Sequence, residues 1–144
     1  MARYSAGWTK AAPATGTFIS QLRTTSAKDI RVWEVGCFCS TAVALSVGLI
    51  RSLTVGATFT TVTPVADDTS AGAAGTLVDT AITTQPTITA NTYLRKAVLP
   101  ATIGAGVIWT FPQGLVVPVS SGLLLWNFGG STGPAVEGYW TYDE

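Results

Sequence analysis

Apolar residues in this chain do not recur at the three- and four-residue spacing of an amphipathic helix in any window. Instead, short runs rich in Val, Ile, Thr and aromatic residues alternate with Gly, Pro, Asp and Ser. Such runs are typical of the strands of a sandwich or a barrel. We therefore expect an all-β protein, an antiparallel β-sandwich, with strands near residues 3–8, 16–22, 30–39, 42–53, 58–65, 77–83, 87–99, 107–111, 115–118, 123–128 and 136–142.

A chain of 144 residues buries about two thirds of the surface that its unfolded form exposes, which is enough for one core. We expect a single sandwich domain over residues 17–144 and an N-terminal arm over residues 1–16. The arm carries Arg3, Tyr4 and Trp8 ahead of a stretch that contains proline. A segment of this kind can add a strand to the sheet of a neighbouring protein.

Only 11% of the residues are charged, against about 25% in an ordinary globular domain. The strand expected at 30–39 is apolar on both faces, and strict alternation places Trp33 with Cys37 on one face and Phe38 on the other. One face fills a core, so the second face needs a cover. A neighbouring subunit would supply that cover, and we expect an obligate homo-oligomer. The alternative is that long loops of the same chain fold over the outer sheet.

The chemistry of the side chains argues against an enzyme. The chain has no histidine, so it has no Ser-His-Asp or Cys-His arrangement. Glu34 and Glu137 are the only acids within aromatic strands and the only pair to consider for a glycosidase. The alternative is that each meets an arginine, such as Arg31 or Arg95, or lies at a subunit rim. The glycine-rich stretches are expected to be turns, and no motif specifies a cofactor.

The charge balance and the apolar stretches bear on partners and location. Eight basic and eight acidic residues give a formal net charge of zero, so we expect no nucleic-acid partner. The uncharged stretch at 35–50 is too short and too interrupted to span a membrane, and prolines divide the one at 97–136. The first ten residues lack the apolar core of a signal peptide, so we expect the chain to stay in a cytoplasm.

Two short clusters raise the question of metal binding. Cys37 and Cys39 stand two apart in an expected strand, a spacing that does not favour a disulfide between them. We interpret both as reduced, buried thiols, because no histidine or second cysteine pair completes a zinc site. Asp67 and Asp68 lie in the flexible stretch 65–76. A cation there is the alternative to a solvated loop tip, so no metal site is expected.

Three segments carry a resemblance to a known family: RVWEVGCFCSTAVALSVGLIR (31–51), YLRKAVLPATIGAGVIWTF (93–111) and GLVVPVSSGLLLWNF (114–128). Together they resemble the jelly-roll cement or decoration proteins of tailed bacteriophages. The resemblance implies a jelly roll of two four-stranded sheets, a homotrimer on the outer surface of the phage head, and the major capsid protein as partner. It also implies a structural protein of the virion, which stabilises the shell and assembles in the cytoplasm of the host bacterium.

Two other functions remain open at this point: a structural component of the phage tail or neck, and a carbohydrate-binding, lectin-like jelly roll. For an oligomer or capsid interface, large aromatic and basic side chains are the expected contacts. The residues predicted for this interface are Arg3, Tyr4, Trp8, Trp33, Phe38 and Trp140.

Overall fold

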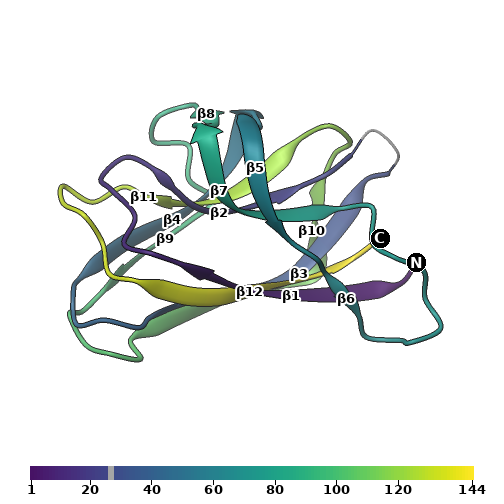
Figure 1. The fold of residues 1–144 in the computed structure, drawn as a ribbon, viewed down its shortest axis with the longest axis horizontal. Coiled ribbons are helices and arrows are strands. Elements are labelled where there is room, and N and C mark those ends of the chain that lie inside the picture. The colour runs from purple at the N-terminus through teal and green to yellow at the C-terminus, as the bar shows by residue number, and fades with distance from the viewer. Residues whose placement is uncertain (26–27) are drawn as a thin grey trace.

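The computed structural model describes residues 1–25 and 28–144 and consists of two antiparallel β-sheets packed face to face (Figure 1). The expected all-β, antiparallel sandwich is confirmed. The sheets contain five and seven strands, whereas the family resemblance implied four in each. The described residues include no helix that could span a membrane.

The first sheet has a long strand at one edge and a two-residue strand at the other. Its order is β10 (Gly106–Val117), β3 (Ile30–Cys39), β12 (Val136–Asp143), β1 (Arg3–Lys10) and β6 (Val65–Ala66). The second sheet has the order β5 (Ala57–Val62), β7 (Leu77–Thr84), β2 (Phe18–Arg23), β11 (Gly122–Asn127), β4 (Leu45–Thr54) and β8 (Thr87–Ile88), and β9 (Arg95–Leu99) also pairs with β4. Most connections carry the chain from one sheet to the other, as in a jelly roll.

The segment expected as a free arm is mostly a strand of the sandwich. β1 pairs with β12 without a register shift, from Arg3 opposite Asp143 to Lys10 opposite Val136. The prediction of an arm over residues 1–16 is therefore corrected for residues 3–10. The physical reason is the alternation within β1, since Tyr4, Ala6 and Trp8 all point into the core and the residues between them point out.

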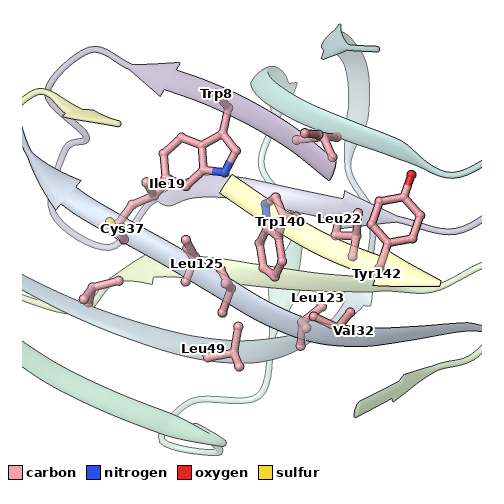
Figure 2. Close-up of a cluster of buried hydrophobic side chains, with 14 of the residues drawn as sticks. Trp8, Ile19, Leu22, Val32, Cys37, Leu49, Leu123, Leu125, Trp140 and Tyr142 are labelled. Carbon is pink, nitrogen blue, oxygen red and sulfur yellow. The ribbon is translucent and has the colours of Figure 1, made fainter. Parts of the chain in front are cut away.

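Aromatic and aliphatic side chains from both sheets fill the space between them (Figure 2). Trp140 and Tyr142 of β12 are fully buried there, and the Trp140 indole Nε1 donates a hydrogen bond of 2.9 Å to the Ser20 hydroxyl. Full burial of one such large side chain stabilises the fold by about 1.5–3 kcal/mol. This core holds the two sheets in a fixed relation, so their outer faces are rigid surfaces.

Three expected strands are divided or joined in the structure. The run 87–99 forms two short strands, β8 and β9, separated by residues 89–94. The runs 107–111 and 115–118 form one strand, β10, whose register shifts between Thr110 and Leu115. The shift has local causes: Pro112 has no N–H for the ladder, and Gly114 adopts a φ of 71°.

The outer face of the second sheet is covered by its own chain. Four buried residues form a second apolar cluster there: Phe18, Ile50, Leu124 and Trp126. The half-buried residues packed on this cluster are Ile82, Ile88, Tyr93 and Phe128. For this sheet, segments of the same chain supply the cover, and a neighbouring subunit is not needed there.

Candidate interaction surfaces

A β-bulge in β3 determines which side chains reach the outer face of the first sheet. Glu34 pairs with Thr110 of β10 and with Thr141 of β12, and the next paired residue of β3 is Val32. Trp33 is thus the extra residue of the bulge, and the alternation of faces shifts there. Cys37 lies in the core and Trp33 lies on the outer side, half-buried. The prediction that Trp33 and Cys37 share a face is wrong for this reason.

Two aromatic rings lie flat on this outer face, over glycines of the neighbouring strands. The Tyr139 ring covers Gly36, and the Phe38 ring covers Gly106; a Cβ atom at either glycine would overlap the ring above it. The two ring centroids are 6.4 Å apart and the ring planes differ by 23°. Because both rings lie against the sheet, they present their faces to the solvent.

A carboxylate stands at each end of this pair of rings. The Tyr139 hydroxyl donates a hydrogen bond of 2.5 Å to Glu34 Oε1. Burial, together with this bond to a carboxylate, raises the pKa of Tyr139 to about 12. At the other end, the exposed Glu137 lies opposite Phe38 in the ladder. We call Glu34, Tyr139, Phe38 and Glu137 the aromatic strip.

The geometry of the aromatic strip does not suit a glycosidase. Glu34 pairs with Thr141, which is four residues from Glu137 on β12, so the backbone positions of the two glutamates are about 13 Å apart along the strands. The carboxylates of glycosidases are about 5–9.5 Å apart. Neither glutamate forms an ion pair with an arginine, since the ion pairs of the described residues are Arg3 with Asp143 and Arg23 with Asp79. The other half of that expectation, a position at a subunit rim, remains a prediction.

Cations of the chain itself cover most of its other partly exposed rings. Five of the eight Lys and Arg residues lie with their charge 3.8–5.6 Å from a ring centroid. These contacts are Arg3 over Trp33, Lys10 over Phe18, Arg23 over Phe59, Arg95 over Phe111, and Lys96 over both Tyr93 and Phe128. Within the described ranges, the two rings of the aromatic strip have no such cation.

The remaining three basic residues gather around the second half of β10. Arg31 lies opposite the partly exposed Val116 in the ladder, and Arg51 lines a cavity of about 410 Å³ together with Val116. Lys28 precedes Asp29, whose carboxylate accepts a hydrogen bond from the exposed Val119 backbone. We call this region the basic edge; it consists of Lys28, Arg31, Arg51, Val116 and Val119.

One end of the sandwich is built from loops without any charged residue. These loops are residues 11–17, 40–44, 100–105 and 128–135. They lie together at the end of the molecule that is opposite the two termini (Figure 1). Their exposed large apolar side chains are Val43 and Ile103, which are 42% and 69% exposed. We call these four loops the uncharged end.

Hydrogen bonds tie the loops of the uncharged end to one another. The Gly133 N–H donates to the Pro13 carbonyl, and the Ser40 N–H donates to the Ala135 carbonyl. The side chain of Asn127, which is 1% exposed, donates to the backbone carbonyls of Pro13, Ala14 and Ser131 at 3.1–3.2 Å. Buried, satisfied hydrogen bonds of this kind fix loop conformation. The uncharged end is therefore a preorganised surface.

The structure divides the predicted interface residues into two groups. Tyr4, Trp8 and Trp140 are at most 6% exposed and belong to the core of the monomer. Their prediction as interface residues is wrong, because aromatic residues of a strand serve the core as well as a surface. Arg3, Trp33 and Phe38 lie on the outer face of the first sheet, where the prediction of a contact remains to be tested.

Arg3 on this face forms an ion pair with Asp143 of the same chain. Its guanidinium donates a hydrogen bond of 2.9 Å to Asp143 Oδ1. Desolvation raises the pKa of Asp143, but the hydrogen bond from Arg3 and the indole N–H of Trp33, together with the charges of Arg3 and of the N-terminus, outweigh it and hold that pKa below its usual value. Arg3 is thus partly neutralised within its own subunit.

The sequence reasoning missed Tyr139 as a member of this surface and gave Glu34 a place at a subunit rim only as an alternative. The signal that could have found Tyr139 is the pair of glycines, Gly36 inside one expected strand and Gly106 directly before another. Glycine within a strand often marks a place where another group approaches the backbone closely. Here the approaching groups are aromatic rings of the adjacent strand.

The candidate metal ligands have other roles in the structure. Burial raises the pKa of the Cys37 thiol to about 12, so this thiol stays protonated at neutral pH. Asp68 accepts two hydrogen bonds from Ser70, which lower its pKa, and Asp67 accepts one from the Ser5 hydroxyl. The described residues contain no group of three or more His, Cys, Asp and Glu side chains placed to hold a metal ion.

Comparison with family models, with curated proteins and with solved structures gives no match to this chain. The function therefore has to be argued from the three surfaces: the aromatic strip, the basic edge and the uncharged end.

Proposed function

We propose that this protein is a structural protein of a tailed-bacteriophage virion, a cement or decoration protein that binds the outer head shell as a homotrimer and stabilises it. The observation that carries the proposal is the uncharged end, in which four rigid loops present Thr, Ser, Gly, Ala and the exposed Val43 and Ile103. The resemblance of the sequence to phage cement proteins supports the choice of the head.

The composition of the uncharged end suits a permanent contact with another protein. The centres of protein interfaces are depleted of charged residues, because an ion that leaves water without a partner carries a large free-energy cost. A standard interface uses about 20–30 residues on each side, which four neighbouring loops can supply. Their internal hydrogen bonds, centred on Asn127, lower the entropy that is lost when the loops bind.

A protein that binds only the assembled shell stabilises the shell by mass action. This gives the proposed cement role a direct physical meaning: the free energy of docking adds to the stability of the head. No catalytic group is required for that role. The expected partners are the major capsid protein and further copies of the chain itself.

The test is a binding experiment on phage heads that lack the protein. We expect the purified protein to sediment with such heads and to raise their melting temperature in calorimetry. Replacing both Val43 and Ile103 by Asp is expected to weaken binding at least tenfold, about 1.4 kcal/mol. The matched control is Val65→Asp, which changes a 70% exposed valine on β6, outside these loops.

Each outcome of this experiment has a definite meaning. Heads that melt at the same temperature with and without bound protein would contradict the cement role. Binding to tails or necks but not to heads would replace the head proposal by the tail or neck component. Equal binding by the double variant and the Val65→Asp control would show that the uncharged end is not the docking surface.

A further inference from the structure

The aromatic strip departs from a pattern that most other half-buried rings follow, although Trp109 also has no cation over it among the described residues. Six rings elsewhere are covered by cations of the same chain. Phe38 and Tyr139 are half-buried, as most of those rings are, yet within the described part of the chain no cation lies over them. The two carboxylates beside them, Glu34 and Glu137, also form no ion pair with a described residue.

The chemistry of the aromatic strip specifies what it can bind. The face of an aromatic ring is the negative side of its quadrupole, and it attracts Lys, Arg or a ligand cation within about 6 Å. Glu34 and Glu137 add two negative charges at the two ends of the rings. A guanidinium suits such a surface best, because it stacks on rings and binds carboxylates with two parallel hydrogen bonds.

The chain itself contains a cation that is available for this contact. Arg51 of the basic edge is exposed, and within the part of the chain that the structure describes it makes no side-chain hydrogen bond, ion pair or ring contact. It stands beside the partly exposed Val116, so the basic edge offers apolar area as well as charge. The aromatic strip and the basic edge are complementary in both respects.

We infer that a second copy of this chain completes the aromatic strip: the basic edge of one subunit packs on the strip of the next, with Arg51 over the rings of Phe38 and Tyr139 and against Glu137. This inference takes the homotrimer from the proposed function. What it adds is the set of residues that make the contact between subunits.

The positions of the two patches determine the symmetry of such a contact. Arg31, at one end of the ten-residue strand β3, belongs to the basic edge, and Phe38, near the other end, belongs to the aromatic strip. Two different patches that bind each other form a head-to-tail contact, which closes into a ring when the rotation between subunits fits. A ring of three is the closed form that agrees with the proposed homotrimer.

The test is the mass of the purified protein in solution, measured by light scattering, for a set of charge reversals. We expect a trimer for the natural sequence. Glu137→Arg alone and Arg51→Glu alone are each expected to lower the mass threefold, to that of a monomer. The double variant, which carries both reversals in one chain, restores the opposite-charge pair between positions 51 and 137 but places a carboxylate over the two rings. It is therefore expected to recover the trimer in part, with an average mass above that of either single variant.

Two controls separate this outcome from general damage. Asp67→Arg reverses an exposed charge outside both patches and should leave the trimer intact. The circular-dichroism spectra of all variants should stay close to that of the natural sequence, because Arg51 and Glu137 are exposed in the monomer; the midpoint of a dissociated variant falls only by the lost free energy of assembly. A natural protein that is monomeric, single variants that remain trimers, or a double variant that is no larger than the single ones would overturn the inference.

The inference and the cement role can fail separately. A monomer that still binds and stabilises phage heads would overturn the inference and leave the cement role standing. A trimer with the expected charge-reversal pattern that fails to bind heads would support the inference and remove the proposed function.

Discussion

The outer face of the second sheet is covered by the protein's own chain, whereas the outer face of the first sheet bears two aromatic rings over which no described segment packs. On the second sheet, Ile88 and Tyr93 come from the stretch between β7 and β9 and pack on Leu124 and Trp126, both of which are buried. On the first sheet, Phe38 and Tyr139 rest on glycines and remain half-exposed.

Since both outer faces carry apolar residues and only one is covered, apolar content alone does not decide whether a face serves folding or association. What matters is whether a connection of the same chain is long enough to fold back over that face. Ten residues between β7 and β9 do so on the second sheet, with only the short β8 among them. We therefore expect substitutions on the second sheet to change the stability of the monomer, and substitutions on the first sheet to change the assembly.

The largest effect should come from the covered face. Leu124→Ala removes a side chain that is 0% exposed, and we expect a loss of about 2–5 kcal/mol in the free energy of unfolding. Urea titration measures this loss. Phe38→Ala, the matched variant on the uncovered face, should cost less than about 1.5 kcal/mol, since its ring is only partly buried. Equal losses for the two variants would contradict the distinction between the faces.

A smaller effect, on the uncovered face, should appear in alkaline solution. Since the pKa of Tyr139 is raised to about 12 in the folded protein, above about 10 in the unfolded chain, its contribution to stability is fully present below pH 10. It is lost as the pH rises through 12. The urea midpoint of the natural sequence should therefore decrease as the pH rises from 10 to 12. The midpoint of the Tyr139→Phe variant should decrease less over the same range. Parallel curves for both proteins would contradict the assignment to Tyr139; the buried Tyr142, whose pKa is also raised, affects both curves alike.

The smallest effect concerns the ion pair on the same uncovered face. Arg3→Gln removes the pair with Asp143, in which the Arg3 side chain is 47% exposed. Exposed pairs contribute about 0–1 kcal/mol, so we expect a change of that size in the free energy of unfolding at neutral pH. Asp143→Asn is the reciprocal variant and should give a similar value. A loss above about 2 kcal/mol in either variant would show that this face contributes to folding much as the covered face does.

Much of the fold could be predicted from the sequence because β-strands and the turns between them have recognisable residue patterns within a short window. The strand at 30–39 has the same bounds in the structure as in the prediction, and most other strands differ by only a few residues at their ends. Alternation and turn residues carry this information within a short window. Residues 87–99 look like one strand for the same local reason, although the covering segment at 89–94 interrupts them.

The surfaces could be predicted only in part, because they depend on contacts between distant segments. The bulge at Trp33 reverses the faces of its strand, and its position is visible only in the pairing with β10 and β12. The sequence predicts Tyr4 and Trp140 as interface residues, because a strand pattern does not say which face meets the other sheet. It predicts Phe38 for the same surface, but the residue that stacks with it, Tyr139, follows more than 100 positions later.

The two ends of the chain are tied together at the side of the sandwich away from the uncharged end (Figure 1). Ala2 and Glu144 exchange two backbone hydrogen bonds of 2.9 Å, and the Glu144 carboxylate accepts further bonds from the backbone of Gly75 and Thr76. A polypeptide fused before Met1 or after Glu144 would leave the protein at the same place. If the uncharged end faces the shell, such a passenger would project outward, so either end of the chain is a suitable point for attaching cargo to the particle.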